Sequence, residues 1–133
     1  MKVDIFSPPP PLPFGEGEER FELCIKRWDA AERSDVVDAF SSGSMLRMQS
    51  AIAPLVIAWN NVLKPDGTPL PLITEDERRI KRSNFDMVIG QLSLPMQLRV
   101  LGGIAEFIGV PAQDFLSNAE EMAGKIGDLR PTG

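Results

Sequence analysis

The chain has 133 residues with 14 basic and 19 acidic side chains, so its formal net charge is −5. This length allows one domain with a modest core, and the acidic balance argues against a surface for nucleic acid or anionic membrane. Histidine is absent and Cys24 is the only cysteine, which excludes Ser-His-Asp or Cys-His catalysis, His-ligated metal, cysteine clusters and an intrachain disulfide. No stretch approaches the ~18–20 apolar residues of a membrane span. We therefore expect a soluble, cytosolic, non-enzymatic protein without cofactor, metal, nucleic acid or membrane partner.

The first nineteen residues contain a proline run. Residues 2–6 alternate apolar and polar side chains and could form a short strand. The following SPPPPLP (7–13) is expected to be extended, because consecutive prolines cannot donate backbone hydrogen bonds. We interpret residues 1–19 as an extended proline-rich arm: a stiff spacer or a contact to a neighbouring subunit is favoured over an SH3-type ligand, because no basic residues flank the prolines. The candidate arm contacts are Pro8, Pro9, Pro10, Pro11 and Pro13.

A strand and a helix are predicted next. Phe21, Leu23 and Ile25 alternate with less apolar neighbours, which is typical of a half-buried strand. Four residues further on, Asp29 and Glu32 have the spacing of a capping box. The spacing predicts a helix over 30–41.

The strongest helical pattern follows. Apolar residues recur at intervals of three and four at Met45, Met48, Ile52, Leu55, Val56, Trp59, Val62 and Leu63. Pro54 lies inside this pattern and should kink the helix or begin a new one. Residues 65–67, Pro-Asp-Gly, predict a turn.

Three further helices are expected. One covers 75–92 and opens with a second capping-box spacing at Thr74 and Glu77. Another contains the apolar stripe from Leu98 to Ile108, and a last one covers about 112–126.

The predicted fold is mainly α: a small helical domain of about five helices with one or two short N-terminal β-strands. We place a single helical domain at 20–127, after the arm at 1–19 and before a flexible tail at 128–133.

Motifs for nucleic-acid binding and catalysis are weak. The basic residues between 78 and 82 spread around a helix and follow an acidic turn. Residues 105–115 look like a helix-turn-helix corner, but Asp114, Glu120 and Glu121 on the second helix would repel phosphate, so a plain helical corner is favoured. Gly102-Gly103 lies in a helical stripe, where close packing against another helix is the simpler reason for glycine than a phosphate loop.

Large apolar side chains are the best candidates for partner binding. They are Trp28, Phe40, Met45, Met48, Trp59, Phe85 and Phe115. Each could instead lie in the core, and for Trp59 the core is favoured because it lies on the strongest apolar stripe. Cys24 is expected to be a small, buried or half-buried strand residue.

Three segments together resemble the phage tail assembly chaperone family. The strand-to-helix entry at 21–33, FELCIKRWDAAER, is similar to the opening of these proteins. The Ile57-Ala-Trp59 helix end, the DGTPLP connection at 66–71 and the Thr74-Glu75 start of a new helix are similar to their central part. The resemblance covers about residues 20–92 and does not include the proline run.

The resemblance implies a non-enzymatic chaperone of the infected host's cytoplasm. Such a protein would bind the tape-measure protein, keep it soluble, help recruit tail-tube subunits, form homo-oligomers and be absent from the mature virion. In many members a ribosomal frameshift adds a C-terminal extension that engages the tube subunit, so this chain would be the short form. Two alternatives stay open: a structural virion component (a neck, connector or minor tail protein) and, with less support, a small helix-turn-helix DNA-binding regulator.

Overall fold

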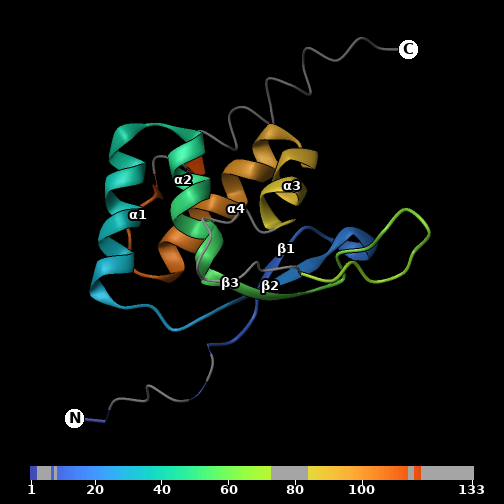
Figure 1. Cartoon of the computed structure of the whole chain (residues 1–133), viewed down its shortest axis with the longest axis horizontal. Helices are drawn as coiled ribbons and strands as arrows, with labels where there is room; N and C mark the ends of the chain where they lie inside the picture. Colours follow the sequence, from blue (N-terminus) through green and yellow to red (C-terminus); the bar gives the residue numbers. More distant parts are fainter. Residues whose placement is uncertain (3–6, 8, 73–83, 114–115, 118–133) are drawn as a thin grey trace.

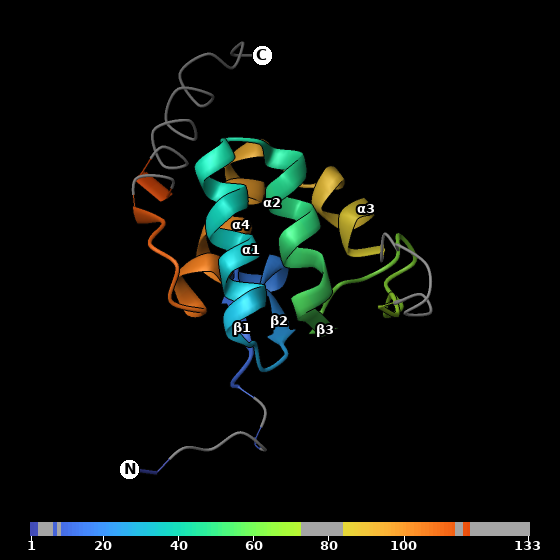
Figure 2. The same ribbon diagram turned by 60° about the vertical axis from the view of Figure 1, so that its left-hand side comes forward.

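The computed structural model describes residues 1–2, 7, 9–72, 84–113 and 116–117 (Figure 1). The elements in chain order are β1 (Leu12–Phe14), the 3-10 helix η1 (Gly17–Glu19), β2 (Phe21–Ile25), α1 (Ala30–Ser42), α2 (Met45–Ile52), the 3-10 helix η2 (Ala53–Leu55), β3 (Val56–Asn60), α3 (Asn84–Gln91) and α4 (Leu94–Phe107). The helices lie on one side of the sheet, so the domain has two layers (Figures 1 and 2). The prediction of a mainly α fold of about five helices was wrong, because the described residues form four α-helices and a three-stranded antiparallel sheet.

The sheet has the order β1-β2-β3, with both pairs antiparallel. The predicted strand at Phe21–Ile25 is confirmed as the central strand β2. Leu23 lies opposite Leu12 of β1 on one side and Trp59 of β3 on the other. Because directly opposed residues of antiparallel strands share a face, these three side chains line the core side of the sheet.

The long helix expected between Met45 and Leu63 ends early. Helix α2 stops at Ile52, and Ala53–Leu55 form a 3-10 turn that contains Pro54. Proline lacks a backbone donor and clashes with the preceding turn of an α-helix. The chain then turns onto the sheet, where the Lys26 amide donates a 2.8 Å hydrogen bond to the Leu55 carbonyl.

A β-bulge explains why β3 has the apolar spacing of a helix. Leu23 and Ile25, two residues apart on β2, pair with Trp59 and Val56, which are three residues apart on β3. The register therefore shifts by one residue, and a bulge of this kind returns the next side chain to the same face. The shift leaves Val56 buried, Trp59 half-buried and Ile57 half exposed, at 50%.

Strand β1 lies within the segment that the sequence analysis placed in the extended arm. Among the described strands it pairs with β2 alone, and such an edge position is where a strand tolerates a proline such as Pro13. Phe14 stacks on Phe21 with ring centroids 5.7 Å apart. A Cβ placed on Gly103 would lie 3.0 Å from the Phe14 ring, so the close approach at this glycine is made by a side chain of strand β1 and not, as predicted from the sequence, by another helix. Residues 3–6 of the predicted first strand lie outside the described residues.

Helix α1 confirms the predicted capping box. The Asp29 carboxylate accepts from the Glu32 amide at 2.8 Å, and the Glu32 carboxylate accepts from the Asp29 amide at 3.2 Å. The helix ends at Ser42, and the C-cap residue Gly43 has the left-handed φ of 71° that glycine adopts without strain. Ser44 then caps α2 by accepting from the Arg47 amide at 3.4 Å.

Helix α4 confirms the predicted stripe around residues 98–108. Ser93 caps it, and Pro95 occupies its first turn, where no backbone donor is needed. Helix α3 falls within the predicted 75–92 helix, whose first part lies outside the described residues. Of the predicted 112–126 helix, the described residues include the hydrogen bond from the Leu116 amide to the Ala112 carbonyl at 2.9 Å. The predicted tail at 128–133 lies outside the described residues.

The predicted turn after β3 is present. The Gly67 amide donates to the Lys64 carbonyl at 2.9 Å, and the Thr68 amide donates to the Asp66 carboxylate at 2.9 Å. The Thr68 hydroxyl donates to the same carboxylate at 2.6 Å and lowers the pKa of Asp66. The turn therefore follows the chemistry expected from Asp-Gly.

The core fills the space between the sheet and the helices. Its fully buried side chains of largest volume are Phe85, Leu23, Ile25, Ile52, Leu55, Ile89, Leu101, Ile104, Ile108, Val36, Val56 and Val100. They come from all four described α-helices, from η2, from strands β2 and β3 and from the residue that follows α4, so the helices and the sheet share one core.

Candidate protein-docking site

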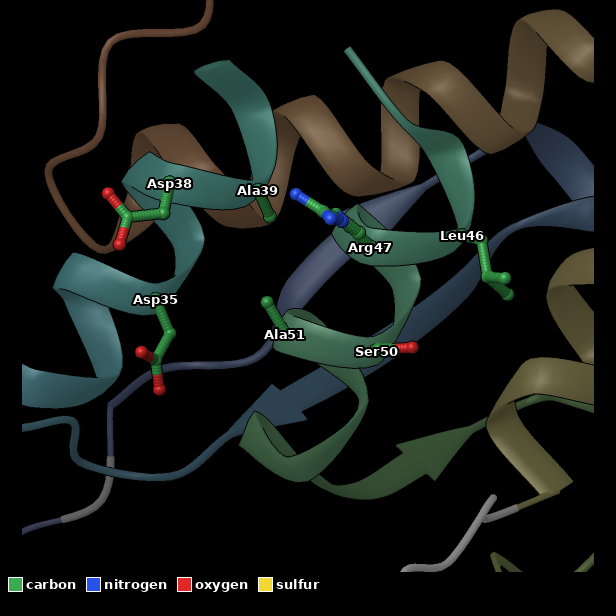
Figure 3. Close-up of a pocket in the computed structure, with 7 residues that line it drawn as sticks. All are labelled: Asp35, Asp38, Ala39, Leu46, Arg47, Ser50 and Ala51. Atoms are coloured by element: carbon green, nitrogen blue, oxygen red, sulfur yellow. The ribbon is translucent and has the colours of Figure 1, made fainter. Parts of the chain in front are cut away.

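Helices α1 and α2 form a hairpin with a groove of about 450 Å³ along its outer surface. Two residues, Gly43 and Ser44, join the helices, so they run side by side in opposite directions (Figure 2). The groove is lined by Asp35, Asp38, Ala39, Leu46, Arg47, Ser50 and Ala51 (Figure 3). We call these seven residues the α1–α2 groove.

The groove exists because the facing residues are small. The side chains that hold the hairpin to the core are Val36 on α1 and Met48 and Ile52 on α2. Next to them, Ala39 and Ala51 fill little of the space between the two helices, so a hollow remains. Leu46 borders the hollow and is 60% exposed.

The two walls of the groove carry opposite charges. Asp35 and Asp38 come from α1, whereas Arg47 comes from α2. Figure 3 shows Arg47 extending from α2 toward α1, while the two carboxylates point away from it. Among the ion pairs between described residues, none includes these three side chains. Their charges are therefore available to a partner.

This arrangement suits a second helix. An apolar side chain can enter above the two alanines and contact Leu46, as in helix packing of ridges into grooves. Its polar neighbours would meet acceptors on the α1 wall and donors, Arg47 and Ser50, on the α2 wall. The groove can hold a protein partner by packing and charge.

Two of the seven predicted partner-binding residues lie in the core. Met48 is 3% exposed and Phe85 is 1% exposed, so neither side chain reaches the surface. Trp59, for which a core position was favoured, is half-buried against the core, and its indole Nε1 donates to the Leu70 carbonyl at 2.6 Å. The hydrogen bond ties β3 to the end of the loop that follows it.

Of the other four predicted partner-binding residues, three are half-buried and one lies outside the described residues. Trp28 is half-buried and meets Phe107 edge to face, with centroids 5.6 Å apart. Phe40 and Met45 are half-buried against the core, and Phe115 lies outside the described residues. None of the six predicted residues that the structure describes lines the α1–α2 groove.

The predicted arm contacts show mixed exposure. Pro9 is half-buried, whereas Pro10, Pro11 and Pro13 are exposed. Pro8 lies outside the described residues. The arm is tied to the domain at Ser7, whose carbonyl accepts a 2.8 Å hydrogen bond from Arg27 Nε.

Sequence reasoning missed the residues of the groove. The predicted partner-binding residues are aromatic residues and methionines, whereas the groove is lined by two alanines, three charged residues, one serine and one leucine. The available signal was Leu46, a large apolar residue beside the stripe through Met45 and Met48 rather than on it.

Large apolar side chains are exposed on other elements too. Besides Leu46, they are Met1, Val37 on α1, Ile57 on β3, Leu63 after β3, Met87 on α3 and Leu94 on α4. Met87 is 73% exposed. Cys24, half-buried on β2, confirms the expected small strand residue.

No protein-family model, no curated protein and no solved structure matches the chain. Among the described residues, none of the helices has the length and apolar character that crossing a membrane requires. The same residues contain no group of three or more His, Cys, Asp or Glu side chains placed to hold a metal ion.

Proposed function

We propose that this chain is a non-enzymatic phage tail assembly chaperone that binds the tape-measure protein, keeps it soluble and helps recruit tail-tube subunits. The proposal begins from the resemblance over residues 20–92 and places the protein in the cytoplasm of the infected host. The observation that supports it best is the exposure of large apolar side chains on both helices and sheet, above all Leu46, Ile57 and Met87.

Exposed apolar side chains suit this function for a physical reason. A long amphipathic helix without its partners aggregates through its apolar stripe, and a chaperone must cover that stripe. Ile57 and Met87 are 50% and 73% exposed, while the buried core remains separate from them. The domain can therefore offer apolar contacts without unfolding.

The test is co-expression with the protein of the longest open reading frame encoded just downstream, which the proposal expects to be the long helical tape-measure protein. The soluble fraction of that protein should rise with the unmodified chain and fall with the double variant Ile57→Glu/Met87→Glu, because both positions become charged. A matched control, Ser34→Glu/Gln113→Glu, adds the same charge at two exposed polar positions and should leave solubility unchanged.

Two results would overturn the proposal. One is a long protein that stays insoluble with the unmodified chain. The other is abundant chain in purified particles, which would favour a structural virion component.

A further inference from the structure

The α1–α2 groove carries both halves of a complementary charge pattern on one surface. Carboxylates lie along α1 at Asp35 and Asp38, and donors lie along α2 at Arg47 and Ser50. A surface of this kind can pair with an identical surface, because each wall finds its complement in the other copy.

The acceptors on α1 and the donors on α2 lie at matching heights along the helix axes. In Figure 3, Asp38 lies at the level of Arg47, and Asp35 lies at the level of Ser50 and Ala51. A two-fold axis parallel to the two helices keeps each residue at its level and exchanges the sides. It therefore places α1 of one copy over α2 of the other, with Asp38 opposite Arg47 and Asp35 opposite Ser50.

We propose that the α1–α2 groove is the docking site for a second copy of this chain. In the resulting dimer, each Arg47 guanidinium donates to the Asp38 carboxylate of the other copy, and each Ser50 hydroxyl donates to Asp35. The contact also covers Leu46, which is 60% exposed in the single chain.

Charge favours a second copy over an unrelated helix. The groove holds two carboxylates and one guanidinium. In a two-fold dimer the carboxylates of each copy face the guanidinium of the other copy, so the same favourable contact forms twice. The purpose of the dimer rests on the proposed function, since a coat along a long partner needs contacts between copies. The geometry of the contact does not depend on it.

Sedimentation velocity of the purified full chain over a concentration series tests the contact. The unmodified chain should form a dimer, and Arg47→Glu should weaken it about tenfold or more, because three carboxylates and no cation then meet at each side. Asp35→Lys/Asp38→Lys should weaken it similarly through repulsion with Arg47. A mixture of these two variants should dimerise again, because each wall then meets the opposite charge.

The mixture distinguishes loss of the dimer contact from misfolding, because two misfolded variants would not form a dimer when they are mixed. Met87→Glu is the control, because it changes an exposed apolar residue outside the groove and should leave the dimer intact. A chain that stays monomeric, a dimer insensitive to Arg47→Glu, or a mixture that stays monomeric would overturn the inference. Each of these results leaves the solubility test of the proposed function unaffected, so the two can fail separately.

Discussion

Helices α4 and α1 have similar lengths, 14 and 13 residues, but different surroundings. In α4 the buried residues are Pro95, Leu98, Val100, Leu101, Gly102, Ile104 and Ala105, whereas α1 buries Val36 and Ala39. Helix α4 is therefore mainly a core element, and α1 presents most of its side chains to solvent. We therefore expect α4 to contribute more to the stability of the domain than α1, and we expect the exposed surface of α1 and α2 to bind a partner.

The largest expected effect is in α4. Ile104 is fully buried, so Ile104→Ala should lower the free energy of unfolding by about 2–5 kcal/mol through lost burial and a cavity. Urea denaturation followed by circular dichroism measures it. Arg99→Ala, at an exposed position of the same helix, should change stability by no more than about 0.5 kcal/mol. Equal effects at the two positions would contradict a core role for α4.

A smaller effect is expected at the start of α1. Asp29→Ala removes the carboxylate that accepts from the Glu32 amide and should cost about 0.5–2 kcal/mol. Asp29→Asn keeps an oxygen acceptor and should retain most of the stability. The same denaturation measurement compares the two variants, and an Asp29→Ala variant as stable as the unmodified chain would show that the cap does not set the stability of α1.

The smallest effect on stability is expected in the α1–α2 groove. Leu46 is exposed, so Leu46→Glu should shift the free energy of unfolding of the monomer by no more than about 0.5 kcal/mol. The same substitution should abolish the dimer in sedimentation velocity. A strongly destabilised monomer would mean that Leu46 belongs to the core, and the contrast between α1–α2 and α4 would fail.

Local patterns predicted the parts of the fold that depend on neighbouring residues. The capping box at Asp29 and the stripe of α4 were both correct, because caps and helix faces are set within one or two turns. Strand β2 was correct because its alternation is regular.

Pairing between distant segments could not be predicted in the same way. The bulge at Ile57 gives Val56 and Trp59 a helical spacing, so the pattern pointed to a helix where a strand pairs with β2. Strand β1 was not predicted because its segment is rich in proline, which indicated an extended arm without pairing. In the structure Leu12 and Phe14 lie opposite Leu23 and Phe21. The groove was missed for a related reason: its hollow depends on two alanines, Ala39 and Ala51, that meet only when the hairpin folds.

The most direct test of the chaperone proposal is the mass, by light scattering, of the complex purified after co-expression with the downstream long protein. We expect one long protein carrying many copies of this chain, with fewer copies for Arg47→Glu, because contacts between copies extend the coat. A chain that elutes alone, with the long protein insoluble, would rule out the chaperone function.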